Sequence, residues 1–187
     1  MNSFKAAFCL ALTIALFVTL NLKLGSVPPA GKFFDPFGGF WNNAEAKEQS
    51  DEDIELEGLQ GTVEIVFDDH RVPHIFATND YDLYFAQGYI TAKHRLWQLD
   101  FQTRFAAGRL SEVVGIKALE LDRYQRRLGM TFGAENMVKE LEKHPEIKAM
   151  AQAYADGINA YIDKLSPAQY PVEFKILDYA PEKWTLL

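Results

Sequence analysis

The stretch YFAQGYITAKHRLWQLD, residues 84–100, carries the clearest period in the sequence. Apolar side chains recur there at alternating steps of four and three, at Phe85, Tyr89, Ala92, Leu96 and Leu99. This spacing is typical of one face of an α-helix. Residues 78–80 can cap a helix start and Gly108 can end one, so we predict a helix over residues 81–107, roughly 40 Å long at 1.5 Å per residue. Gly88 costs up to about 1 kcal/mol relative to alanine inside a helix, which indicates that a neighbouring backbone packs closely there.

The same stretch holds Lys93, His94, Arg95 and Asp100, residue types that often serve in catalysis. A step of about 100° per residue puts Asp100 about 120° round the helix from His94, so the two cannot act as a dyad. Catalysis by His94 would also need a nucleophile and an orienting partner, and the sequence names neither. We therefore interpret these residues as a polar face in which Arg95 and Asp100 form ion pairs.

A β-hairpin is predicted before this helix, in TVEIVFDDHRVPHIFATND, residues 62–80. Apolar and polar residues alternate over 63–67, residues 69–71 supply a turn, and residues 72–77 resume an extended run. Pro73 must lie at a strand start or an edge, because proline cannot donate to the ladder.

Shorter helical patterns follow Gly108. We predict a helical turn stopped by Gly115, a short helix or loop over 117–130, a helix over 131–142 and a long amphipathic helix from about 147 to 165. Residues 171–187 are predicted to be an extended segment followed by a proline-containing turn. The fold class is therefore α+β, mostly helical with an initial β-hairpin.

Residues 1–57 differ in amino-acid composition from the rest of the chain. Residues 1–24 carry an apolar run typical of a signal peptide; the run is shorter than the roughly 20 residues that cross a membrane, although residues 21–24 can extend it into an anchor. Both alternatives stay open. Residues 25–57 are rich in proline and glycine and then acidic, and we interpret them as a tether whose aromatic cluster can lie at a lipid interface. Residues 58–187 form the folded part.

Charge and cysteine content exclude some functions. The formal net charge of -7 and the acidic run over residues 45–57 argue against nucleic acid as a partner. Cys9 is the single cysteine and lies within the apolar run, so the folded part has neither an internal disulfide nor a cysteine metal site.

No other cluster completes a site. His70 and His74 flank a turn but lack the third ligand that zinc needs. The arginines at 123, 126 and 127 are expected to pair with Asp122, Glu120 and Glu112 rather than to recognise a carboxylate. Ser111 and Ser166 lack the context of an activated nucleophile. We predict no catalytic, cofactor-binding or metal-binding residue in this chain.

Several motifs nevertheless follow one another in a specific order. The first is VPHIFA at 72–77. The second consists of GY at 88–89, Ala92, RL at 95–96 and QLD at 98–100, and the third is GRLSE at 108–112 with Gly115. The last two are YADGINAYI at 154–162 and DYAPEKW at 178–184. This order resembles the opening of the penicillin acylase family of N-terminal-nucleophile hydrolases, over nearly all of the folded part. His94 stands where the family usually has aspartate, and Arg71 where it usually has glycine. We expect both to be local surface changes.

The resemblance implies a function that residues 58–187 do not perform alone. Members of the family are exported precursors that divide into an α chain and a β chain, and the first residue of the β chain, usually serine, attacks the amide with its own amino group as the base. This chain would be an early, truncated part of the α chain, inactive alone, within an αββα architecture when complete. Its implied partners are the β chain of the same precursor and a small acylated amide, such as a β-lactam or an acyl-homoserine lactone.

The implied location is the periplasm or the outer face of a membrane, and the calcium site of some members is left open for the complete protein. The competing interpretation is a membrane-tethered helical binding module without catalysis. The two differ in exposed apolar surface, which the first interpretation predicts because Phe85, Trp97, Phe101 and Phe105 spread widely round their helix.

Overall fold

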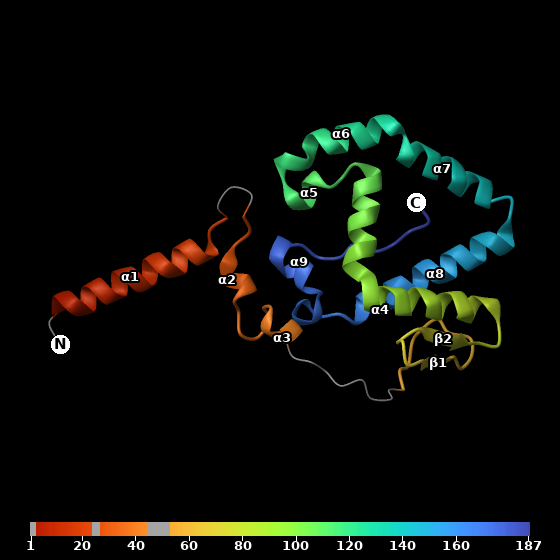
Figure 1. Cartoon of the computed structure of the whole chain (residues 1–187), viewed down its shortest axis with the longest axis horizontal. Helices are drawn as coiled ribbons and strands as arrows, with labels where there is room; N and C mark the ends of the chain where they lie inside the picture. Colours follow the sequence, from red (N-terminus) through yellow and green to blue (C-terminus); the bar gives the residue numbers. More distant parts are fainter. Residues whose placement is uncertain (1–2, 24–26, 45–52) are drawn as a thin grey trace.

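The computed structural model describes residues 3–23, 27–44 and 53–187, and in those ranges the chain is mostly helical with one two-stranded hairpin. The elements in chain order (Figure 1) are α1 (Ser3–Asn21), α2 (Ala30–Phe33), α3 (Trp41–Ala44), β1 (Glu64–Phe67), β2 (Pro73–Phe76), α4 (Asp80–Ala107), α5 (Ser111–Val114), α6 (Leu119–Leu128), α7 (Met130–Leu141), α8 (Pro145–Lys164) and α9 (Val172–Leu177). Short 3₁₀ turns lie at Ile116–Ala118 and Pro167–Gln169. The predicted class, mostly helical with an initial β-hairpin, is confirmed.

The core forms where α4 crosses α8, and glycines allow the crossing. A Cβ on Gly88 would overlap the carbonyl oxygen of Tyr154, and a Cβ on Gly157 would overlap that of Phe85. The two helix backbones are therefore in contact, which confirms the close packing predicted from Gly88. The buried residues of the main apolar cluster come from α4, α8 and α9, and they are Ala92, Leu96, Ile158 and Phe174.

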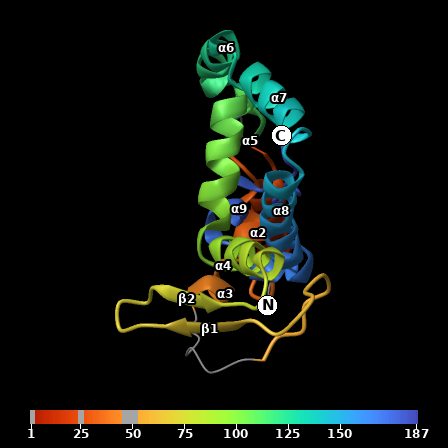
Figure 2. The same ribbon diagram turned by 90° about the vertical axis from the view of Figure 1, so that its right-hand side faces the viewer.

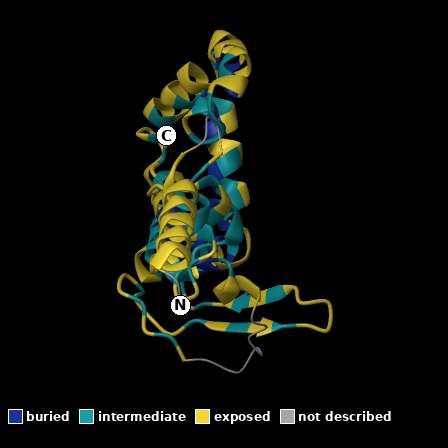
Figure 3. Ribbon diagram, turned by 90° about the vertical axis from the view of Figure 1, so that its left-hand side faces the viewer, coloured by how far each residue is buried: buried dark blue, intermediate teal, exposed yellow. Residues whose placement is uncertain are grey.

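The predicted hairpin is present. β1 and β2 pair antiparallel, with Glu64 opposite Phe76 and Phe67 opposite Pro73, so that the proline starts its strand as expected. Figure 2 shows the hairpin extending beside the first half of α4, and Figure 3 shows exposed and partly buried residues alternating along it. Arg71 in the turn has a φ of 60°, the left-handed region that favours glycine.

α4 begins and ends as predicted but is not straight. The Asn79 side chain accepts a hydrogen bond from the backbone N–H of Asp82, and Gly108 ends the helix in a left-handed conformation. At Arg95 the backbone leaves helical geometry, with φ −141° and ψ 25°. The prediction of one continuous helix of roughly 40 Å was therefore wrong. A kink divides the helix, and its second half turns towards α6 (Figure 1).

Two segments depart from the sequence-based expectation. Residues 171–187 were expected to begin with an extended run, but Val172–Leu177 is helix α9, because this conformation places Phe174 in the core, where it is fully buried. Residues 27–44 lie in the predicted tether, where no helical period lasts more than a few residues, but they contain the short helices α2 and α3 and form hydrogen bonds with Tyr170 and with Lys175 of α9. Residues 24–26 and most of the acidic run lie outside the described residues, and the division at residue 58 stays a prediction.

Candidate functional site

The polar residues that first suggested catalysis lie on different sides of α4. His94 is exposed, and its ring meets the Phe67 ring edge-on at 5.8 Å. Partial burial, followed by the charges of Lys93 and Arg95, lowers the pKa of His94. Asp100 is buried on another face, beyond the kink. The structure therefore does not bring His94 and Asp100 together.

Asp100 belongs instead to an ion-pair cluster, which comprises Asp100, Arg104, Arg109, Glu112 and Glu182. The Arg104 side chain is only 5% exposed and lies 2.8 Å from Asp100, 2.9 Å from Glu112 and 3.0 Å from Glu182. Arg109 contacts the same two glutamates at 2.8 and 2.9 Å. The cluster thus ties α4 and α5 to the segment after α9. The expected ion pair of Asp100 is present, whereas Arg95 donates to the neutral Gln98 side chain.

Tyr179 completes this cluster on its buried side. Its hydroxyl donates to Asp100 Oδ2 at 3.0 Å, and its ring lies 5.2 Å from the Arg104 guanidinium carbon, as in a cation–π contact. Burial, and then the charge of Asp100, raises the pKa of Tyr179. The phenol therefore stays neutral at physiological pH and serves as a donor.

The charges of the cluster reinforce one another. Burial alone would lower the pKa of Arg104, but its interactions with Asp100 and Glu182 outweigh burial and raise it. Hydrogen bonds to Glu112 and Glu182 raise the pKa of Arg109. The hydrogen bond from Arg109 outweighs burial and lowers the pKa of Glu182. Every guanidinium in the cluster already faces a carboxylate, so the cluster fixes geometry and offers no free cation to an anionic ligand.

A cleft of about 710 Å³ adjoins the ion-pair cluster, between the second half of α4, the start of α7 and residues 182–187. Of the described residues that line it, none is a histidine or a cysteine. Two of its hydroxyls already donate to backbone carbonyls, Thr103 to Leu99 and Thr185 to Leu187. The cleft can accommodate apolar groups, but it does not assemble a nucleophile with a base.

The arginines of α6 pair only partly as predicted. Arg123 binds Glu120 at 2.5 Å, whereas Arg126 donates to the carbonyl oxygen of Gly108 at 2.9 Å. Glu112 binds Arg104 and Arg109 instead, so its predicted pairing was wrong.

Asp122 has a role that its sequence position did not reveal. Its carboxylate accepts the backbone N–H groups of Leu110 and Ser111 at 2.9 and 2.7 Å, so it was wrongly predicted to pair with an arginine of α6. The bonds cap the start of α5 from another helix. Burial would raise the pKa of Asp122, but the hydrogen bonds from Ser111 and Leu110 outweigh it and lower the pKa.

The remaining candidates stay apart. His74 Nε2 lies 3.2 Å from Asp68 Oδ2, and among the described residues no group of three metal-ligating side chains forms. The Ser166 hydroxyl contacts Gln169 at the start of a 3₁₀ turn, which is a capping role. Sequence reasoning did not identify Tyr179 and Glu182 as members of the cluster, because they approach Asp100 and Arg104 only through the tertiary fold.

Comparison with known proteins shows which family this chain resembles. The family model described as Penicillin amidase matches residues 62–187. Penicillin acylase 2 proenzyme of Pseudomonas sp. (strain SE83) is 36% identical over 131 residues, which is 70% of this chain and 16% of that protein. Penicillin G acylase of Escherichia coli is 30% identical over 78% of this chain and 16% of its own length. Acyl-homoserine lactone acylase QuiP of Pseudomonas fluorescens is 32% identical over 77% of this chain and 17% of its own length.

A solved structure extends the similarity to the fold. The thermostable penicillin G acylase from Alcaligenes faecalis matches with a TM-score of 0.60 and 30% identity, over 67% of this chain and 66% of that one. The chain spans about one-sixth of the length of the curated relatives. The family model covers nearly all of the region that contains the hairpin, the α4–α8 core and the ion-pair cluster, and the chain therefore belongs to the penicillin amidase family.

Proposed function

We propose that residues 58–187 are the scaffold part of the α chain of an exported amidohydrolase, and that a serine at the start of a β chain from the same precursor performs catalysis. The observation that carries this proposal is the family match combined with the geometry of the site. The matched region contains a pre-formed ion-pair cluster and an apolar cleft, and the residues that line this cleft do not bring a nucleophile next to a base.

The lengths of the relatives support a division into chains. The region shared with this chain is 16% of the Pseudomonas proenzyme but 66% of the solved Alcaligenes chain. A solved chain that is several times shorter than a proenzyme of the same family is what cleavage of a precursor would produce.

Exposed apolar side chains support a missing neighbour. On α6 and α7, Leu128, Met130, Phe132 and Met137 are each more than half exposed. Patches of this kind on a soluble domain usually mark an interface. We assign this surface, the α6–α7 face, to the β chain. Phe85 was expected to contribute exposed surface as well, but it is buried, whereas Phe105 is exposed as expected.

The substrate class follows from the family and remains broad. The relatives are named as acylases of penicillins and of acyl-homoserine lactones, and both substrates present an acyl group on an amide nitrogen. We propose a small acylated amide as the substrate.

The test is intact-mass and terminal-peptide analysis of the protein from its native cells, combined with assays on chromogenic amides. We expect a second polypeptide that begins with serine, activity in the two-chain protein, and none in purified residues 1–187. A native protein without a second polypeptide would contradict the proposal and favour the binding-module interpretation. Amide hydrolysis by residues 1–187 alone would overturn the assignment of catalysis to the β chain.

A further inference from the structure

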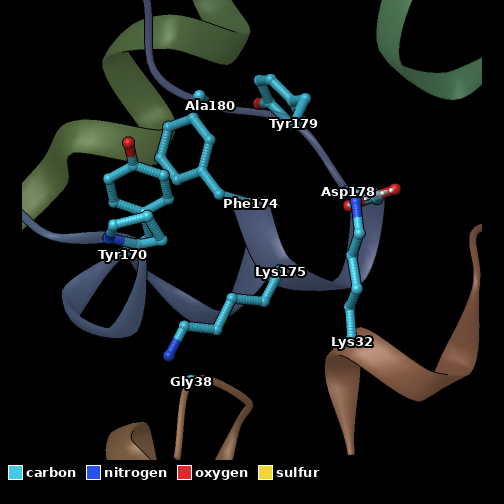
Figure 4. A pocket seen from close by; sticks show the side chains of 9 residues that line it. Lys32, Gly38, Tyr170, Phe174, Lys175, Asp178, Tyr179 and Ala180 are labelled. Carbon is cyan, nitrogen blue, oxygen red and sulfur yellow. Dashed lines mark hydrogen bonds and ion pairs between the residues drawn. The ribbon is translucent and has the colours of Figure 1, made fainter. Parts of the chain in front are cut away.

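The segment of residues 27–44, which we name the arm, is docked on α9 by polar contacts. Lys175 Nζ donates to the Gly39 carbonyl at 2.9 Å, to Asn43 Oδ1 at 2.7 Å and to the Ala168 carbonyl at 2.8 Å. Lys32 forms an ion pair with Asp178 at 2.9 Å, as Figure 4 shows. The arm therefore holds a defined position on the folded part.

The space between the arm and α9 is not a ligand site. It measures about 390 Å³, and both of its lysines are already engaged. An ammonium group has three N–H donors, and Lys175 places all three on oxygen atoms of the protein. Burial lowers the pKa of Lys175. The contact thus serves attachment, and the outward side of the arm is the side that can bind something else.

The arm exposes three aromatic rings to solvent. Phe37 is 85% exposed, Phe34 52% and Trp41 51%. They sit on an ordered frame, because Phe33 stacks on Phe40 at 4.9 Å and the Asp35 carboxylate accepts the backbone N–H of Gly38 at 2.7 Å. An ordered turn that presents several large rings to water is costly unless another apolar phase covers them.

Helix α1 identifies that phase. It has 19 residues, a mean hydropathy of 2.0 and no buried residue. At 1.5 Å per residue its length comes to roughly 28 Å, close to the roughly 30 Å of a bilayer core. A Cβ on Gly31 would lie 2.9 Å from Asn21 Oδ1, so α2 packs against the end of α1. Figure 1 shows α1 projecting away from the helical body with the arm at its inner end.

We propose that α1 is retained in the membrane and that the arm lies at the lipid–water interface, where Phe34, Phe37 and Trp41 enter the headgroup region. Aromatic side chains favour this depth, and the end of a spanning helix delivers them to it. Because Lys175 and Asp178 fix the arm to α9, the bilayer then sets the orientation of the folded part. The inference does not depend on the proposed catalytic function.

The test uses the full chain and its single cysteine, Cys9. A polarity-sensitive dye is attached at Cys9, or at a new cysteine in C9S/F37C, or in C9S/K143C. The proteins are reconstituted in vesicles of phosphatidylethanolamine and phosphatidylglycerol that carry shallow or deep lipid quenchers. Lys143 is exposed beyond the end of α7, on the side of the molecule away from the arm, and serves as the matched control. Phe34 and Trp41 remain in place in the F37C variant.

We expect deep quenching at position 9, a blue shift with shallow quenching at position 37, and an aqueous spectrum at position 143. An aqueous spectrum at position 37 together with a quenched dye at position 9 would overturn the interfacial placement. An unquenched dye at position 9 would overturn the spanning role of α1. A native N-terminus that lies beyond residue 23 would show that α1 is removed, and would also overturn the proposal.

Discussion

Gly157 lies at the crossing of α4 and α8, where there is no space for a side chain. Its Cα faces the backbone carbonyl of Phe85, and backbone at a helix crossing cannot move aside as a flexible side chain can. A methyl group at this position must push α8 away from α4, and the separation opens the buried cluster around Ile158.

We expect Gly157→Ala to lower the free energy of unfolding by about 2–4 kcal/mol, measured by urea unfolding of the full chain in detergent micelles. Gly133→Ala in α7 is the matched control, because nothing lies within 4 Å of its Cβ position. That control should be neutral or stabilise the protein by up to about 1 kcal/mol, since alanine favours helices. Equal stability of the two variants would show that the crossing is not tight.

Arg71 illustrates a residue whose side chain conflicts with its backbone. Left-handed geometry costs a non-glycine residue roughly 1–2 kcal/mol, while glycine costs about 0.5–1 kcal/mol in chain entropy. Arg71→Gly should therefore stabilise the hairpin by about 0.5–1 kcal/mol, seen as slower amide hydrogen exchange in β1 and β2. Arg71→Ala keeps the strain and should give no gain. A similar gain in both variants would point to the loss of the arginine side chain instead.

At the scale of elements, α5 depends on a carboxylate from α6. Since the folded-state pKa of Asp122 is lowered, its contribution to stability is complete above the ordinary aspartate pKa and is lost as the pH falls through the folded-state value. We expect Asp122→Asn to cost about 1–3 kcal/mol at pH 7, with the difference from the parent protein shrinking below about pH 4. Thermal unfolding across this pH range measures the difference. A cost that does not change with pH would contradict a role for the charge.

The ion-pair cluster joins three elements through one buried arginine. Arg104→Met leaves buried Asp100 without its ionic partner, and we expect a loss of about 3–5 kcal/mol in the free energy of unfolding. Arg109→Met removes a side chain that is 37% exposed and contacts the same glutamates, so its cost should stay near or below about 1 kcal/mol. Urea unfolding of both variants measures the difference, and comparable losses would show that Arg104 is not the central residue.

The sequence predicted most elements because their signals are local. The cap at Asn79, the glycine stops at 108 and 115 and the alternation of the hairpin each act within a few residues. The misses have long-range causes. The kink at Arg95 has no proline or glycine beside it, and α9 is helical because Phe174 fills the core. Likewise, i,i+4 spacing brings Asp100 to Arg104, but only the fold adds Glu182.

For the whole molecule, the α6–α7 face is the surface that the proposed function most needs to explain. Replacing Leu128, Phe132 and Met137 together with glutamine should reduce binding of a hydrophobic dye to residues 1–187, because these side chains are exposed in the chain alone. In the two-chain protein the same changes should weaken association of the chains, measured by co-purification and by the yield of amide hydrolysis. A matched triple replacement of exposed polar residues, Glu135, Lys139 and Glu142, should change neither. Normal assembly of the apolar variant would show that the β chain does not cover this face.

The α4–α8 crossing also has a consequence for the order of events during synthesis. The apolar face of α4 around Ala92 and Leu96 finds its cover on Ile158 and Phe174, which the ribosome adds long after α4 is complete. Until then the apolar face of α4 is uncovered and the helix is only marginally stable, because an isolated helix gains little from its own hydrogen bonds. The nascent polypeptide therefore stays incompletely folded over this interval, with the apolar face of α4 accessible to chaperones.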